Sequence, residues 1–184
     1  MNITVIGRGN LGGGLADLWE RAGHQVARLG RDGGAVGATE TVLLAVPGTE
    51  VASALSSVTG LKGKTVLDAT NRYGDAQPPA GFSSNAEYVK SVTGGPTAKA
   101  FSTNFAALFG QIAEARVRPS NLWSGDDGAR SVVAQLSIDA GYDAVRLGDL
   151  SMAATQEGMA ATMFAIAQSG LGQFVYRMAA PEQL

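Results

Sequence analysis

The sequence predicts an α/β fold in which a doubly wound parallel sheet is covered by helices on both faces. Short apolar segments rich in β-branched residues alternate along the chain with segments of helical periodicity. A glycine-rich turn joins the first apolar segment to the first helical one. With 184 residues, of which 45% are hydrophobic, the chain is expected to form one domain over residues 1–184 with a full core.

The predicted strands are short apolar runs that end at a glycine, a proline or a polar turn. The first run, ITVI, ends at Gly7. The third, TVLLAV, ends at Pro47, which cannot donate a hydrogen bond to a sheet ladder. The strands are expected at residues 3–6, 25–29, 41–46, 64–69, 97–101, 121–124 and 144–147.

The predicted helices carry apolar residues at intervals of three or four between these strands. In the first helix Leu11, Leu15, Leu18 and Trp19 share one face, and residues 21–23 close it. Further helical segments are expected at residues 50–58, 85–92, 105–111 and 127–141, with a C-terminal helical segment at 151–179.

The segment between the second and third strands is shorter than this kind of sheet usually requires. Residues 30–37 include four glycines and cannot form a stable helix. A crossover with its helix needs at least about 10–12 residues before any strand is added, and only residues 30–40 are available. We therefore expect the usual third strand and its preceding helix to be missing. Fully extended, these residues span roughly 36 Å, so strand 41–46 can lie across the first strand from the second.

The turn after the first strand fits the phosphate-binding pattern G-x-G-x-x-G and opens a helix. In this pattern the first glycine makes the tight turn, the second lets the backbone approach a pyrophosphate, and the third lets helix and strand pack closely. The helix N-terminus then offers free N–H groups to the phosphates. This context is typical of a Rossmann-type dinucleotide-binding domain, although a turn without a ligand is the alternative. The turn comprises Gly7, Arg8, Gly9, Asn10, Leu11 and Gly12.

The end of the second strand favours NADP over NAD. An NAD site places a carboxylate there for the ribose hydroxyl, whereas an NADP site places a cation there for the 2′-phosphate. Arg31 is the natural phosphate partner because its planar fork matches phosphate oxygens. Asp32 has the loose spacing of a ribose carboxylate, but it stands beyond Arg31 and no acid occupies the strand end itself. A solvated turn with both charges in water is the alternative.

The nicotinamide half of the cofactor is expected at the ends of the third and fourth strands, because ligands of open parallel sheets bind beyond the carboxyl ends of strands. Ala45, Val46 and Pro47 end the third strand. Asn71 follows the fourth and can offer an amide donor and acceptor to the ribose or the ring carboxamide. Asp68 could equally cap a neighbouring turn, so it is left out of the predicted site.

Composition excludes several classes of function. The formal net charge of −2 argues against a nucleic-acid partner. With no cysteine and one histidine, the chain offers no thiol chemistry and no typical zinc site, so no metal centre is expected. The first residues lack the pattern of a signal peptide, and no apolar run is long enough to span a membrane. A cytoplasmic protein is therefore expected.

Several short motifs recur in the order found in a known family. They are ITVIGRGNLG, LLAVP, VLDATN, KAFSTNFA, SGDDGA and GDLSMAATQE, which together extend over nearly the whole chain. The chain thereby resembles the deazaflavin (coenzyme F-420)-dependent NADP oxidoreductases, and most closely a shortened subgroup of dinucleotide-binding oxidoreductases. The resemblance implies direct hydride transfer between NADPH and a flavin or deazaflavin, with the two rings stacked in a cleft and no essential protein acid or base.

The resemblance also implies roles for individual residues. Val46 and Pro47 correspond to the strand end beside the nicotinamide, and Ala100 and Phe101 to the strand that lines the ring. Arg31 corresponds to the arginine that binds the 2′-phosphate. The sequence departs from the family where Gly30 replaces a serine, Ser102 an asparagine and Ala154 an arginine.

Two other functions remain open from the sequence. One is a non-catalytic NADP-binding or sensing module. The other is a reductase of small imines or carbonyls, as in the related β-hydroxyacid dehydrogenase lineage. That lineage normally carries a catalytic Lys or Asp on a long helix, and residues 151–179 contain neither. No nucleophile–base set is evident, so no catalytic residue is predicted.

The C-terminal end of the chain indicates a homodimer. Gly170 and Gly172 interrupt the last helical segment before the apolar residues 174–176. This apolar piece has few obvious partners within so short a chain. A contact with a second copy of the chain is therefore expected.

Overall fold

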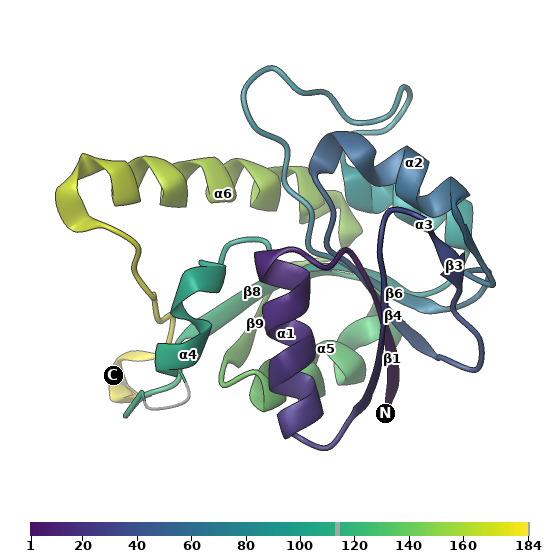
Figure 1. Ribbon diagram of the computed structural model, residues 1–184. Helices are drawn as coiled ribbons and strands as arrows, with labels where there is room; N and C mark the ends of the chain where they lie inside the picture. The colour runs from purple at the N-terminus through teal and green to yellow at the C-terminus, as the bar shows by residue number, and fades with distance from the viewer. Residues whose placement is uncertain (113–114, 184) are drawn as a thin grey trace.

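The central sheet has seven strands in the computed structural model, which describes residues 1–112 and 115–183 (Figure 1). The strands are β1 (Asn2–Ile6), β2 (Gln25–Leu29), β4 (Thr41–Leu44), β6 (Thr65–Asp68), β7 (Thr97–Ala100), β8 (Ser120–Gly125) and β9 (Asp143–Gly148). Their order across the sheet is β2-β1-β4-β6-β7-β8-β9. All neighbouring pairs except β7 with β8 are parallel.

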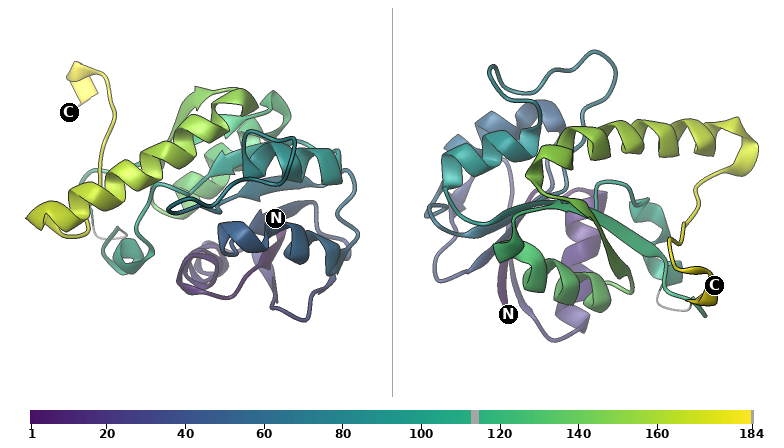
Figure 2. Two further views of the ribbon diagram at one scale, coloured as in Figure 1. Left: turned by 90° about the horizontal axis from the view of Figure 1, so that it is seen from above. Right: turned by 180° about the vertical axis from the view of Figure 1, so that it is seen from behind.

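Helices cover both faces of this sheet, as expected for a doubly wound fold (Figure 2). One face carries α1 (Asn10–Arg21), α4 (Phe109–Ile112) and α5 (Arg130–Asp139), and the other carries α2 (Val51–Ser56), α3 (Asn85–Thr93) and α6 (Ala153–Ile166). Successive residues of a strand point to opposite faces. Val5 accordingly joins the buried cluster under α1 and α5, whereas Ile6 joins the one under α2 and α3. The predicted fold class is confirmed.

The short connection between β2 and β4 adds no strand to the central sheet and contains no helix. β4 lies on the other side of β1 from β2, with Ile3 opposite Thr41 in one ladder and Val26 in the other. The predicted shortening is therefore confirmed for the main sheet. The connection does form the two-residue strand β3 (Gly34–Ala35), which pairs with β5 (Val58–Thr59) in a separate small sheet.

One pair of strands departs from the parallel arrangement of the sheet. β8 runs antiparallel to β7, with Ala100 opposite Trp123. A parallel return would need a crossover of roughly a dozen or more residues, usually a helix that spans the sheet. Between β7 and β8 the described residues form one 3-10 turn and the four-residue helix α4. Neither of these elements spans the sheet, and the chain enters β8 at the edge where β7 ends.

The predicted helical segment at 151–179 is also too long. α6 continues into a π-turn at Ala167–Leu171, and residues 172–180 contain no helix. Gly170 and Gly172 end it, because their φ angles of 111° and 75° are unfavourable for other residues. The chain then turns back towards the sheet, where the Ser120 amide donates to the Tyr176 carbonyl at 2.8 Å. None of the described helices is long and apolar enough to cross a membrane.

Candidate functional site

A pocket of about 330 Å³ lies at the carboxyl ends of β4, β6 and β7, between the N-terminus of α1 and the underside of α6. It brings together residues that the sequence analysis had predicted separately. Those that line it are Asn10, Leu11, Ala45, Val46, Pro47, Asn71 and Phe101. The other predicted residues lie outside the lining: Gly7, Arg8, Gly9 and Gly12 form the turn beside it, Arg31 follows β2, and Ala100 lies in the core.

The glycines of the turn are required for different structural reasons. Gly7 has a φ of 108°, and a Cβ there would lie 2.2 Å from the Ala45 carbonyl oxygen. A Cβ on Gly12 would lie 2.1 Å from the Gly7 carbonyl oxygen, so both positions exclude a side chain. A Cβ on Gly9 would meet nothing within 4 Å. Gly9 therefore borders open space at the N-terminus of α1, where no side chain caps the free N–H groups.

Phe101 has strained backbone at the end of β7. It is the one described non-glycine residue with a positive φ, of 62°, which bulky side chains rarely adopt. The Asn121 side chain holds this turn by accepting a hydrogen bond from the Phe101 amide at 2.9 Å. The Phe101 ring packs edge-on against Trp19 with centroids 5.7 Å apart. Phe101 borders the pocket, but its ring is buried in the same core cluster as the neighbouring Ala100.

Asn71 presents an unused acceptor at the pocket. Its Nδ2 donates to the Ser102 carbonyl at 2.6 Å, which fixes the orientation of the amide. Its Oδ1 is buried and has no hydrogen-bond partner in the described part of the chain. Such orphaned groups are uncommon in folded proteins. The acceptor is available for a ligand N–H or hydroxyl group.

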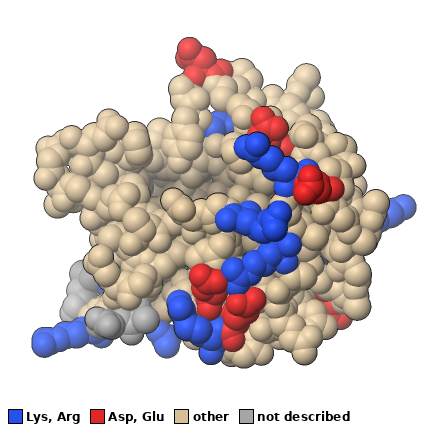
Figure 3. Space-filling view, viewed as in Figure 1, with Lys and Arg blue, Asp and Glu red and all other residues tan. Residues whose placement is uncertain are grey.

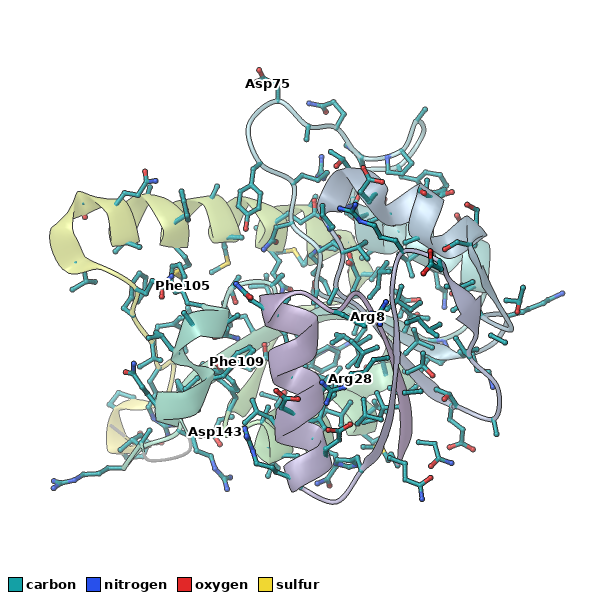
Figure 4. All side chains as sticks on the ribbon, in the orientation of Figure 1. Arg8, Arg28, Asp75, Phe105, Phe109 and Asp143 are labelled. Atoms are coloured by element: carbon teal, nitrogen blue, oxygen red, sulfur yellow. The ribbon has the colours of Figure 1, made fainter. Side chains whose placement is uncertain are left out.

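The outer wall of the pocket is apolar and aromatic. Met163 and Phe164 of α6 line it, and the Tyr73 and Phe164 rings lie 6.2 Å apart. Phe105 lines the opposite side (Figure 4). Its ring packs on Phe174 of the returning C-terminal chain, with the ring centroids 5.5 Å apart. Aromatic side chains of this kind can pack against a planar ring.

Acid and base groups are scarce at this wall. Among the described residues that line the pocket, Tyr73 alone has a titratable side chain. Burial raises the pKa of Tyr176, which does not line the pocket and whose hydroxyl shares a hydrogen bond with the lining residue Thr103, so this phenol stays protonated at neutral pH. The single histidine, His24, lies at the amino end of the sheet, with Nε2 2.7 Å from Asp139. General acid–base catalysis in the pocket therefore has few candidates.

A buried ionic network lies beside the pocket and was missed in the sequence analysis. The ammonium group of Lys99 is fully buried 3.0 Å from Asp68 and 3.1 Å from Glu157, and it also donates to the Thr70 carbonyl. Glu157 accepts a further hydrogen bond from Arg72 at 2.7 Å. Asp68 also caps the turn at Thr70, as the sequence suggested. A lysine inside the otherwise apolar β7 was the signal, because a buried charge needs a carboxylate partner.

Arginines gather at the end of β2, beside α1 (Figure 3). Arg28 is paired with Asp17 at 2.8 Å and Glu20 at 2.6 Å. Two further arginines, Arg8 and Arg31, have no hydrogen bond or ion pair with any described residue. The first of these extends from the phosphate turn and the second follows β2, so two free cations lie near the place predicted for a 2′-phosphate.

No protein-family model and no curated protein sequence matches the chain. Solved structures do match it in fold. One from Arthrobacter sp. FB24, described as a "putative F-420-dependent NADP reductase", has a TM-score of 0.78 at 22% identity, covering 98% of this chain and 100% of its own. The chain has a Rossmann-type fold. An Aspergillus terreus imine reductase in complex with NADPH4 has a TM-score of 0.66 at 15% identity, covering 91% of this chain.

A second imine reductase, from Streptomyces aurantiacus, has a TM-score of 0.62 at 16% identity and covers 92% of this chain. The chain spans 63% of the length of each of these two imine reductases. Both are therefore longer proteins of which this chain matches only a part, whereas the Arthrobacter protein is matched from end to end.

Proposed function

We propose that this protein is an NADP-dependent oxidoreductase that passes hydride directly between the nicotinamide of NADPH and a flavin or deazaflavin ring. The observation that carries the proposal is the pocket itself. It begins at the open phosphate turn and ends at an aromatic wall whose described lining has no titratable side chain besides Tyr73. Such a site can hold two planar rings and needs no protein acid or base between them.

The residues present fit a dinucleotide along its whole length. The open space at Gly9 and the free N–H groups of α1 would receive the pyrophosphate. Arg31 would bind the 2′-phosphate. Ala45, Val46 and Pro47 would border the nicotinamide, and the unpaired Oδ1 of Asn71 would accept a hydrogen bond from its carboxamide or ribose.

The contribution of the chain to the reaction is binding and orientation. NADPH would supply the hydride, which carries two electrons, and the acceptor ring would take it up. Phe101 and the Asn71 amide fix one wall of the pocket, while Met163 and Phe164 limit the distance to the other. The rate of such a transfer depends on how closely the two rings are held.

The acceptor is tested by anaerobic oxidation of NADPH with riboflavin, FMN, FAD and a deazaflavin, beside a separate measurement of NADPH affinity. We expect turnover with at least one planar acceptor. Tight NADPH binding without turnover of any acceptor would instead support a non-catalytic sensing module. Turnover of a cyclic imine, with no flavin or deazaflavin turnover, would favour the imine reductase alternative.

Replacement of Arg31 with alanine should weaken NADPH binding by about 1.5–3 kcal/mol, the range for a hydrogen bond to a charged group. NADH binding should hardly change, because NADH lacks the 2′-phosphate. Calorimetry with both cofactors checks this expectation. Equal affinity of the native protein for NADPH and NADH would contradict the choice of cofactor.

We further propose that α6 and the chain after it form a homodimer contact. The outer half of this apolar helix and the π-turn that follows it project from the sheet (Figure 2), where Phe164 of the helix is 49% exposed and Leu171 of the turn is 64% exposed. A helix that is apolar on every side normally has partners on every side. The native protein should have the mass of a dimer by light scattering, and the double variant Ile166→Glu, Leu171→Glu should be monomeric. A monomeric native protein would refute the contact.

A further inference from the structure

The side chain of Arg8 lies flat on the backbone at the end of β2. The ends of β1 and β2 are neighbours, since the Gly7 amide donates to the Leu29 carbonyl at 3.0 Å. The next residues along each strand, Arg8 and Gly30, therefore meet. A Cβ built on Gly30 would lie 2.0 Å from Nη2, 2.6 Å from Cζ and 2.7 Å from Nε of Arg8. The guanidinium occupies the volume that a side chain at Gly30 would fill.

The charge of Arg8 is uncompensated in this position. The two acids of α1, Asp17 and Glu20, both form ion pairs with Arg28. Asp32 forms no ion pair with Arg8 or Arg31 in the described part of the chain. The end of β2 thus carries two exposed and unpaired arginines, Arg31 directly after Gly30 and Arg8 packed over it.

We propose that Arg8 is a second specificity-determining residue for the 2′-phosphate of NADP, and that Gly30 is required because it leaves room for the Arg8 guanidinium. This inference rests on the proposed NADP-dependent function. A phosphate monoester carries about −1.5 to −2 charges at neutral pH, more than one arginine can neutralise. The planar fork of arginine matches phosphate oxygens in paired hydrogen bonds. Arg8 and Arg31 together can supply two positive charges to such a group.

The position of Gly30 allows a test that leaves the arginines in place. Gly30 does not have a positive φ, so alanine fits its backbone. The group that a new Cβ meets is the flexible end of Arg8, which can swing into solvent without disturbing the core. Gly30→Ala should therefore preserve the melting temperature while displacing the guanidinium from the phosphate site.

The experiment measures dissociation constants of NADPH, NADH, 2′,5′-ADP and 5′-AMP for the native protein and three variants, Arg8→Ala, Gly30→Ala and the double variant. Each single variant should bind NADPH and 2′,5′-ADP about tenfold more weakly, corresponding to a charged hydrogen bond of about 1.4 kcal/mol. NADH and 5′-AMP should bind as in the native protein. The double variant should be no weaker than Arg8→Ala alone, because both changes remove the same interaction.

Arg28→Ala is the matched control, since it removes the same charge from the same strand end but from an arginine that already has partners. It should leave the preference for NADPH within about twofold of native, because screened surface charges contribute little. Equal weakening of NADPH and NADH by Arg8→Ala would overturn the inference and assign Arg8 to the pyrophosphate or the adenine. The inference would also be overturned if the losses of NADPH affinity in Arg8→Ala and Gly30→Ala added up in the double variant. A native protein without any preference for NADPH would instead overturn the proposed function itself.

Discussion

Replacement of Lys99 with methionine should lower the free energy of unfolding by about 3–5 kcal/mol, the usual cost of removing one partner from a buried ion pair. Lys99 is fully buried between Asp68 and Glu157, whose side chains are also buried. Without the ammonium group, two carboxylates would share a dry site near Arg72 alone. Whole domains are stable by only about 5–15 kcal/mol, so the loss should be evident in urea unfolding.

Lys90→Met is the control for this prediction. Lys90 also pairs with a carboxylate, that of Asp126, at 2.7 Å, but both side chains are partly exposed. Its loss should cost no more than about 1 kcal/mol. Similar losses for the two lysine variants would show that burial does not distinguish the two ion pairs. The predicted role of the Lys99 network, which joins β6, β7 and α6 beside the pocket, would then be wrong.

Gly9→Val should weaken NADPH binding at least about 100-fold, or 2.7 kcal/mol, while the protein stays folded. Nothing lies within 4 Å of a Cβ at this position, and the φ of −74° suits valine. The added side chain would instead fill the space through which a pyrophosphate reaches the backbone N–H groups of α1. Loss of a favourable N-cap residue should cost the fold about 1 kcal/mol at most.

Two glycine variants separate this blocked approach from general damage. Gly158→Val introduces the same side chain into open space on α6 and should keep native affinity for NADPH. Gly7→Val should unfold the protein, because its Cβ would lie 2.2 Å from the Ala45 carbonyl oxygen. Calorimetry and thermal melting on the three proteins check both properties. If Gly9→Val bound NADPH with native affinity, the assignment of the pyrophosphate to this turn would be wrong.

Local pattern and chain length were sufficient to predict much of this architecture. The GRGNLG turn sits between β1 and α1 because strand, glycine turn and helix are consecutive in the sequence. The crossing of β4 to the other side of β1 followed from the few residues available after β2. Both features follow from how far the chain can reach or how it can bend. These limits can be evaluated without knowing which residues are neighbours in the folded protein.

Tertiary contacts alone decided the rest. The direction of β8 depends on which edge of the sheet the chain reaches after β7, and hydrophobic pattern is the same for either direction. The chain after Gly172 returns to Thr103 and Ser120 because those partners are folded beside it, and they lie far away in the sequence. In the same way, Lys99 acquires its carboxylates from β6 and α6, and Arg8 its place over Gly30 from β2. Composition and periodicity thus determined which elements form, whereas the environment of each charged side chain was set by segments distant in sequence that only folding brings together.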